Sequence, residues 1–193
     1  MERQVVVIAG PSGSGKNAVI DALLERSKKC SLLVNVTTRP SREGEKEGVD
    51  YYFFPIDDFK RGIKTGSILE YRFVPSLGTY YGTYKPDLES RIAKGDVVLA
   101  HKDIIGARYL KEHYDAVTIF LLPESIESLE RRIRARNPGM SPAELAERMK
   151  MVKREVEEEA PQYDYRVVNA DGKLEETISD VMAILKKEGY NLE

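Results

Sequence analysis

The stretch VVVIAGPSGSGKN, from Val5 to Asn17, decides how the rest of the chain is interpreted. A continuous, largely β-branched apolar run is typical of a strand that is buried on both faces of a parallel sheet. The turn that follows it matches the phosphate-binding pattern G-x-x-x-x-G-K at Gly10, Gly15 and Lys16. Glycines let successive backbone N–H groups point at phosphate oxygens, and the next helix adds the positive end of its dipole. The stretch therefore predicts a strand, a phosphate-binding loop and a helix, in that order.

The last position of this motif departs from the pattern. Asn17 stands where a serine or threonine hydroxyl would bind Mg²⁺. An amide oxygen is also a hard neutral donor, and Mg²⁺ readily keeps several of its waters. We therefore expect Asn17 to hold the metal less directly, for example through a water, rather than to abolish metal binding. The alternative for the whole loop is a glycine-rich helix start that binds no phosphate.

Helical and extended patterns alternate along most of the chain. Apolar residues at helical spacing predict helices over residues 16–29, 56–66, 85–94, 104–113, 125–136, 141–159 and 174–187. Short apolar runs predict strands over residues 5–9, 32–36, 51–54, 68–74, 79–83, 97–100, 116–122 and 165–168. Strands that alternate with helices indicate a parallel α/β sheet. The middle of the chain, about 35–84, is richer in strands and turns and is expected to form a small inserted lobe.

Composition and charge bear on the partners and the compartment of the protein. The 193 residues include 30 Lys and Arg against 32 Asp and Glu, a near balance that gives no support for a nucleic-acid surface. A single cysteine, Cys30, excludes an internal disulfide and is compatible with a reducing cytosol. No segment approaches the roughly 18 apolar residues of a membrane span. We expect a cytoplasmic protein with no nucleic-acid or membrane partner. The sequence does not indicate whether the protein is a monomer or an oligomer.

A second constellation lies in TTRPSREGEKEGVDYYFF, from Thr37 to Phe54. Arg39 and Arg42 are three residues apart in a loop that follows a strand, and arginine forks match the oxygens of a terminal phosphate. The hydroxyl groups of Tyr51 and Tyr81 could donate to the same phosphate. A solvated charged loop is the alternative for such a stretch in isolation. Together with the first loop, it indicates two phosphate sites that face one another.

The run T-T-R-x-x-R-x-x-E-x-x-G-x-x-Y-x-F within this stretch resembles the signature of the guanylate kinase family. The segments LEY (69–71), TYYGT (79–83), DIIGAR (103–108) and YDYRVVNADG (163–172) resemble further blocks of that family, in the family's order. The resemblance covers nearly the whole chain. It implies a Mg²⁺- and ATP-dependent kinase that converts GMP to GDP by direct in-line phosphoryl transfer, with dGMP as a further candidate substrate.

The resemblance also implies residue roles. The loop would bind ATP through Gly10, Pro11, Ser12, Gly13, Ser14, Gly15, Lys16 and Asn17. The GMP phosphate would be held by Arg39, Arg42, Tyr51 and Tyr81. The guanine would be surrounded by Asn35, Glu70, Thr83 and Asp103, with Asn35 where the family usually has serine. Glu70 also has independent support, because a carboxylate accepts from guanine N1–H and N2–H₂ together, a donor pair that adenine lacks.

By the same resemblance, the stretch ERRIRARNPGMSPAELAERM would form a mobile lid at about 136–159. Arg136 and Arg148 would close over the transferring phosphoryl group, with Lys16 and Arg39 completing the catalytic set. For Arg132, assistance in the lid and a place on a solvated basic helix face are equally supported. His101 departs from the family, which usually has an acid two residues before Asp103. Imidazole suits softer metals than Mg²⁺, so an ordinary hydrogen bond is the preferred interpretation of His101.

The predicted fold is thus α/β, a P-loop NTPase-type parallel sheet flanked by helices with an inserted nucleotide-monophosphate-binding lobe and a small lid. The core of this single domain, 1–193, would comprise residues 1–34, 85–135 and 160–193. Two other functions stay open at this point. A ribose 1,5-bisphosphate kinase would share the fold and resemble the loop, although Glu70 fits a nucleotide base better. A non-catalytic guanylate-kinase-like binding module would typically have a degraded loop, whereas this chain keeps Lys16 and the glycines.

Overall fold

A five-stranded parallel sheet forms the core of the computed structural model, which describes residues 3–193. Its strand order is β2-β7-β1-β8-β9. The strands are β1 (Val5–Ala9), β2 (Cys30–Leu32), β7 (Val97–His101), β8 (Val117–Pro123) and β9 (Tyr165–Asn169). The predicted P-loop-type parallel sheet is therefore confirmed.

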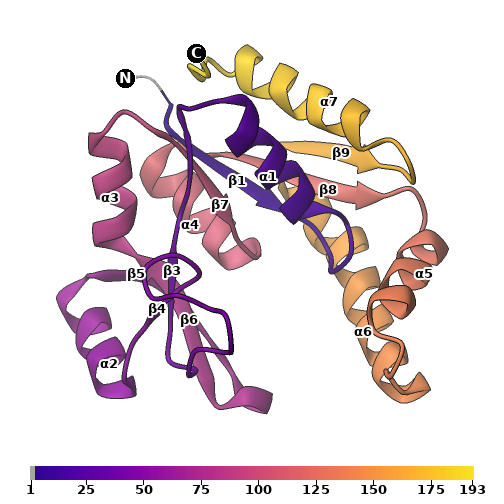
Figure 1. Ribbon diagram of the computed structural model, residues 1–193, viewed down its shortest axis with the longest axis horizontal. Coiled ribbons are helices and arrows are strands. Elements are labelled where there is room, and N and C mark those ends of the chain that lie inside the picture. Colours follow the sequence, from indigo (N-terminus) through magenta and orange to yellow (C-terminus); the bar gives the residue numbers. More distant parts are fainter. Residues whose placement is uncertain (1–2) are drawn as a thin grey trace.

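Helices cover both faces of this sheet, which explains why its strands are continuous apolar runs. On one face, α1 (Lys16–Arg26) and α7 (Leu174–Lys187) pack on the side chains of Val6 and Ile8. On the other face, α3 (Lys85–Ala93) and α4 (Ile104–Tyr114) pack on Val5 and Val7. All four of these β1 side chains are fully buried. Figure 1 shows α1 and α7 together above the sheet.

A second, four-stranded sheet is built from the middle of the chain, in the order β4-β3-β6-β5. Its strands are β3 (Asn35–Thr37), β4 (Tyr52–Phe53), β5 (Ile68–Val74) and β6 (Thr79–Tyr84), with a 3₁₀ turn at Pro75–Leu77. The helix α2 (Ile56–Thr65) closes a small core in which Phe59 packs with Val36 and Ile68. In Figure 1 this lobe projects from the core at lower left, and α5 (Ile126–Arg136) with α6 (Pro142–Arg154) projects at lower right.

Two segments differ from the sequence-based expectation. The single strand predicted over residues 32–36 is two strands in different sheets, because the chain turns at Val34, whose N–H donates to the Asp87 carboxylate at 2.9 Å. The helix predicted over 141–159 ends at Arg154 and continues as a π-helical turn, Glu155–Glu159, and a 3₁₀ turn, Ala160–Gln162. The predicted serine cap of α5 is present at Ser125.

No helix within residues 3–193 is long and apolar enough to cross a membrane.

Candidate active site

The glycine-rich loop lies where β1 ends and α1 begins, as predicted. Gly10 and Gly15 have φ values of 139° and 90°, a backbone conformation that residues with a side chain rarely adopt. A Cβ on Gly10 would lie 2.5 Å from the carbonyl oxygen of Leu121. From β9, the Asn169 side-chain amide donates to the Ser14 carbonyl at 2.8 Å. The loop is therefore held in one conformation by its own glycines and by a strand at the sheet's edge.

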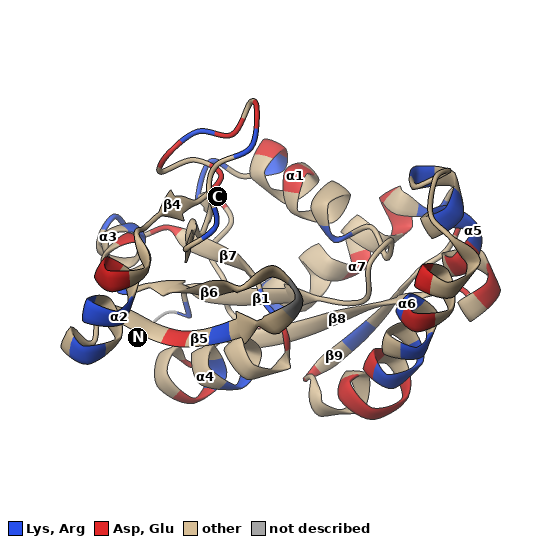
Figure 2. Cartoon of the chain, turned by 90° about the horizontal axis from the view of Figure 1, so that it is seen from below, with Lys and Arg blue, Asp and Glu red and all other residues tan. Residues whose placement is uncertain are grey.

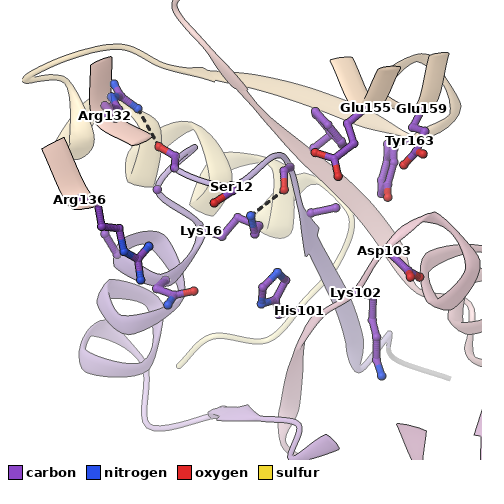
Figure 3. A pocket seen from close by; sticks show the side chains of 17 residues that line it. Ser12, Lys16, His101, Lys102, Asp103, Arg132, Arg136, Glu155, Glu159 and Tyr163 are labelled. Atoms are coloured by element: carbon purple, nitrogen blue, oxygen red, sulfur yellow. Dashed lines mark hydrogen bonds between the residues drawn. The ribbon is translucent and has the colours of Figure 1, made fainter. Parts of the chain in front are cut away.

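A cavity of about 600 Å³ surrounds this loop. Five segments line it: the loop itself, the end of β7, β8, α5 and the stretch after α6, as Figure 3 shows in part. The loop contributes Gly10, Ser12, Gly13, Gly15, Lys16 and Asn17, whereas Pro11 and Ser14 are buried and do not line the cavity. The Ser14 hydroxyl is buried without a hydrogen-bond partner in the described part of the chain. A buried hydroxyl without a protein partner, in a glycine-rich loop at the start of a helix, fits an anion-binding function.

The Lys16 ammonium is folded back onto its own loop. It donates to the carbonyl oxygens of Gly10 and Pro11 at 2.6 and 2.9 Å. Burial lowers its pKa to about 8, and Arg136 acts in the same direction while Glu155 opposes the shift. Phosphate oxygens bring negative charge into this cavity, so they would stabilise the protonated ammonium.

The surroundings of an expected Mg²⁺ ion are sparse in protein ligands. Asn17 is exposed and lines the loop cavity with Glu155 and Glu159. Within residues 3–193, no three His, Cys, Asp or Glu side chains gather into a metal site. Mg²⁺ is commonly held by one or two protein oxygens together with substrate phosphates and waters, and an amide oxygen at Asn17 fits that mode of binding.

His101, at the end of β7, faces the same cavity. Part of its ring is exposed, yet burial lowers its pKa to about 4, and the positive charges of Lys16 and Lys102 add to this shift. The imidazole is therefore neutral at pH 7. No hydrogen bond of its ring is found in the described part of the chain, so the expected hydrogen bond is not formed.

The lobe carries the residues expected to hold a monophosphate. Arg39 forms a two-pronged ion pair with Glu45, with both N···O distances 2.5 Å, and lies over the rings of Tyr51 and Phe53 at 5.0 and 5.5 Å. The rings of Tyr51 and Tyr81 are in edge contact, 6.0 Å between centroids. The structure thus brings three of the four residues together.

Arg42 differs from the other three. Its backbone N–H donates to Glu45 at 2.8 Å, and its side chain is exposed. Sequence reasoning did not foresee Glu45 as the residue that fixes this loop, although the carboxylate is part of the quoted signature.

A second cavity, about 330 Å³ in volume, lies between the lobe and the end of β7. Asn35, Glu70, Tyr51 and Tyr81 line it from the lobe. His101, Lys102 and Asp103 line both cavities. The two cavities therefore meet at the carboxyl end of β7, beside the phosphate-binding loop.

Asp103 has a structural task as well as a position between the cavities. Its carboxylate caps α4 by accepting from the N–H groups of Ile105 and Gly106, both at 3.1 Å. It also lies 3.4 Å from an Arg72 nitrogen. Only part of its acceptor capacity is left for a ligand.

Lys102 is a cavity-lining residue that sequence reasoning missed. It is buried, and its ammonium donates to the side-chain oxygens of Asn35, Glu70 and Thr83, with a distance of 3.0 Å to Glu70 Oε1. Thr83 Oγ1 donates to the same Glu70 oxygen at 2.6 Å. A lysine that follows an apolar strand looks like an ordinary surface charge in the sequence. The one available sign of a role in the site was its position between His101 and Asp103.

The expected lid arginines lie in different surroundings. Arg136 lines the loop cavity and is exposed. Arg148, on α6, is half-buried and does not line it. Arg132 donates to Asp171 at 2.8 Å and to the Asn169 carbonyl at 3.0 Å, so it ties α5 to the end of β9. Figure 2 shows charges of both signs along α5 and α6.

The family model described as guanylate kinase matches residues 2–188. The chain belongs to the guanylate kinase family. It is 38% identical over 169 residues to a guanylate kinase of Synechocystis sp. (strain ATCC 27184 / PCC 6803 / Kazusa), covering 87% of this chain and 86% of that protein. The guanylate kinase of Symbiobacterium thermophilum is 38% identical over 185 residues, 95% of this chain and 85% of the other. The crystal structure of guanylate kinase from Anaplasma phagocytophilum is similar with a TM-score of 0.73 and 33% identity, covering 98% of this chain and 88% of that one.

Membership in this family confirms the prediction of a P-loop nucleoside monophosphate kinase, and with it GMP phosphorylation by ATP as the activity. The hypotheses of a ribose 1,5-bisphosphate kinase and of a non-catalytic binding module give way to this guanylate kinase assignment. The roles of single residues stay predictions, which the placement of each side chain makes testable.

Proposed function

We propose that the γ-phosphoryl group of ATP passes directly to the 5′-phosphate of GMP at the end of β7, where the two cavities meet. The observation that carries this proposal is the sharing of His101, Lys102 and Asp103 by both cavities. In-line transfer requires the acceptor phosphate to face the γ-phosphoryl group of ATP, with the attacking and leaving oxygens in line. Water must be excluded and the charge of the phosphate oxygens neutralised.

ATP binds with its phosphates in the loop, from Gly10 to Asn17. Lys16 exchanges its two carbonyl partners for phosphate oxygens, an exchange favoured by the charge of the ligand. Arg136 lines the same cavity and has no ion-pair partner in the described residues. It therefore neutralises charge on the transferring group.

Mg²⁺ accompanies ATP, and it would neutralise charge on the phosphate oxygens and orient them. Asn17 would hold the ion, directly or through a water. The loop cavity offers the amide oxygen of Asn17 with Glu155 and Glu159 as further oxygen donors.

The GMP phosphate binds to Arg39, Arg42, Tyr51 and Tyr81. Arg39 has five N–H donors, and its bonds to Glu45 and to the Pro40 carbonyl leave donors for a phosphate. Arg42 has an exposed side chain that is free to join it. The guanine then lies toward Asn35, Glu70, Thr83 and Asp103.

The segment 35–84 and the segment 136–159 act as a nucleotide-monophosphate lobe and a lid that close on the core. Arg148 lies outside the loop cavity, and closure is the motion that brings it to the phosphates. Closure also excludes the water that would hydrolyse ATP. We place the reaction in the cytoplasm, with ATP and GMP as the small-molecule partners.

A coupled ADP-release assay with GMP, dGMP, AMP and ribose 1,5-bisphosphate tests this function, with Mg²⁺ and Mn²⁺ in parallel. GMP is expected to turn over, with dGMP measured beside it, and AMP and ribose 1,5-bisphosphate should be far behind. Turnover of ribose 1,5-bisphosphate without turnover of GMP would overturn the proposal. Nucleotide binding without turnover would overturn it in favour of a binding module.

A further inference from the structure

The ion pair between Lys102 and Glu70 lies in the base region of the second cavity, and neither the proposed function nor the sequence pattern gives Lys102 a task. The two side chains are only 6% and 11% exposed. Lys102 uses its three N–H groups on Asn35, Glu70 and Thr83. Glu70 accepts two hydrogen bonds at Oε1, whereas its Oε2 has none in the part of the chain that the structure describes.

Helix α4 is built to leave room for this pair. Gly106, in its first turn, is buried, and a Cβ there would lie 2.9 Å from Lys102 Cδ and 3.1 Å from Glu70 Oε1. Figure 3 shows the Lys102 side chain extending away from the phosphate loop, unlike that of its neighbour His101. Lys102 therefore serves the monophosphate side of the junction.

We propose that Lys102 is a specificity-determining residue that donates a hydrogen bond to the 6-oxo group of the purine. Lys102 Nζ, Glu70 Oε1 and Glu70 Oε2 present a donor, an acceptor and an acceptor in sequence. The Watson–Crick edge of guanine presents O6, N1–H and N2–H₂, which are an acceptor, a donor and a donor. The inference rests on the proposed GMP kinase function and assigns the recognition of one atom of its substrate.

The base binds while the ammonium of Lys102 and the carboxylate of Glu70 stay next to each other. One Lys102 hydrogen turns from Glu70 Oε1 to O6, and N1–H of guanine takes the lone pair that becomes free. Oε2, which has no partner in the described part of the chain, accepts from N2–H₂. Adenine would instead turn an amino group toward the ammonium, donor against donor, in a site that excludes water.

A purely structural task for Lys102 makes a different prediction. If Lys102 only holds Glu70 in place, its removal weakens every purine that binds Glu70 by the same factor. If Lys102 reads position 6, its removal weakens only purines with a good acceptor there. The two cases separate on 6-thio-GMP, which keeps N1–H and N2–H₂ but has a weakly accepting sulfur at position 6.

Calorimetric titration of GMP and of 6-thio-GMP, without ATP, tests the inference on wild type and on Lys102→Met. A hydrogen bond from a charged donor is worth roughly tenfold to a hundredfold in affinity. Wild type should bind GMP at least tenfold more tightly than 6-thio-GMP, and Lys102→Met should bring this ratio close to one. An unchanged ratio in Lys102→Met overturns the inference. Lys94→Met, an exposed lysine at the end of α3, is the matched control and should keep the wild-type ratio.

Removal of Lys102 leaves a carboxylate without its partner, so a second pair of variants guards against misfolding. The ratio should persist in Glu70→Gln and disappear in the double variant Glu70→Gln, Lys102→Met, in which no buried charge is left alone. Persistence in both overturns the inference. Wild-type protein that phosphorylates GMP but shows no preference for the 6-oxo group refutes the task of Lys102 alone. Wild-type protein that neither binds nor phosphorylates GMP refutes the proposed function with it.

Discussion

At the scale of single residues, the site depends on charges that have partners before any ligand arrives. Lys16 donates to loop carbonyls, Arg39 pairs with Glu45, and Lys102 pairs with Glu70. Such pairing fixes side chains near the positions where phosphates and base would bind, which lowers the entropy lost on binding. Asn17 and His101 are the residues of the loop cavity that depart from the family pattern, and each gives a test.

The substitution Asn17→Ser should lower the Mg²⁺ concentration required for half-maximal activity. A hydroxyl close to the backbone reaches the ion directly, whereas the longer amide shifts the ion or leaves a water between. We expect a several-fold change in Mg²⁺ dependence and an unchanged KM for GMP. Activity measured over a range of Mg²⁺ concentrations at saturating ATP gives the Mg²⁺ dependence. Identical curves for the two proteins would show that residue 17 has no part in metal binding.

The depressed pKa of His101 predicts an acid-sensitive fold. Its pKa is about 4 in the folded chain against about 6.5 when unfolded, so the unfolded state binds more protons between these pH values. Stability is therefore lost as pH falls from about 6.5 toward 4. His101→Gln cannot take up this proton, and its melting temperature should fall less over that window. If the melting temperatures of the two proteins fall by the same amount from pH 7 to pH 4, the prediction is contradicted.

Sequence reasoning found residues whose chemistry matches a ligand and missed those whose task depends on a neighbour far along the chain. Glu70, Tyr51 and Tyr81 were predicted because their donors and acceptors match those of a nucleotide, and all three line the second cavity. Lys102 was missed, since its partners lie 19 to 67 positions away. The cap formed by Asp103 was missed as well, because a candidate ligand-binding carboxylate gave no reason to look for a second use.

At the scale of elements, the predicted helices and strands are mostly confirmed because their apolar spacing matches the faces that the sheet covers. The exceptions are segments where tertiary contacts decide. The chain leaves the central sheet at Val34 because Asp87, from α3, accepts its N–H. The long helix after Ser141 becomes a π-helical turn at Glu155–Glu159, beside the loop cavity. Neither switch has a local signal in the sequence.

Asp87→Ala should destabilise the protein markedly. Asp87 is 8% exposed, accepts from the Val34 N–H and pairs with Arg91 at 2.7 Å. Its loss leaves a buried N–H and a cation without partners, at a cost of about 3 kcal/mol. Urea denaturation measures this cost. Glu89→Ala, an exposed position on the same helix, is the control and should change stability by less than about 0.5 kcal/mol. Equal effects at the two positions would contradict the task assigned to Asp87.

At the scale of the whole molecule, the core holds the loop and the end of β7, and two projecting parts carry the remaining groups. The lobe bears Arg39 and Glu70, and α5 with α6 bears Arg136 and Arg148. The family assignment and the fold follow from the sequence. The distances across the junction do not, because they depend on how both projecting parts stand relative to the core.

Arg136→Met should lower kcat while leaving both KM values within about threefold. The guanidinium acts on charge that develops during transfer, and removal of one such donor typically costs about 10²–10³ in kcat. Steady-state kinetics with GMP and ATP varied in turn separates the effect on kcat from the effect on each KM. Arg134→Met, on the same helix and paired with Glu130, is the control with unchanged kinetics. A variant with raised KM and normal kcat would show that Arg136 only binds ground-state ATP.

The junction of the two cavities is tested most directly by calorimetric titration with a bisubstrate analogue, adenosine and guanosine joined through five phosphates. If the loop cavity and the lobe cavity meet at the end of β7, one molecule fills both, because the linkage makes the second contact intramolecular. The predicted result is a stoichiometry of one and an affinity at least about 100-fold above that of ATP or GMP alone. An affinity no better than that of ATP, with the GMP site still open to GMP, would contradict the account.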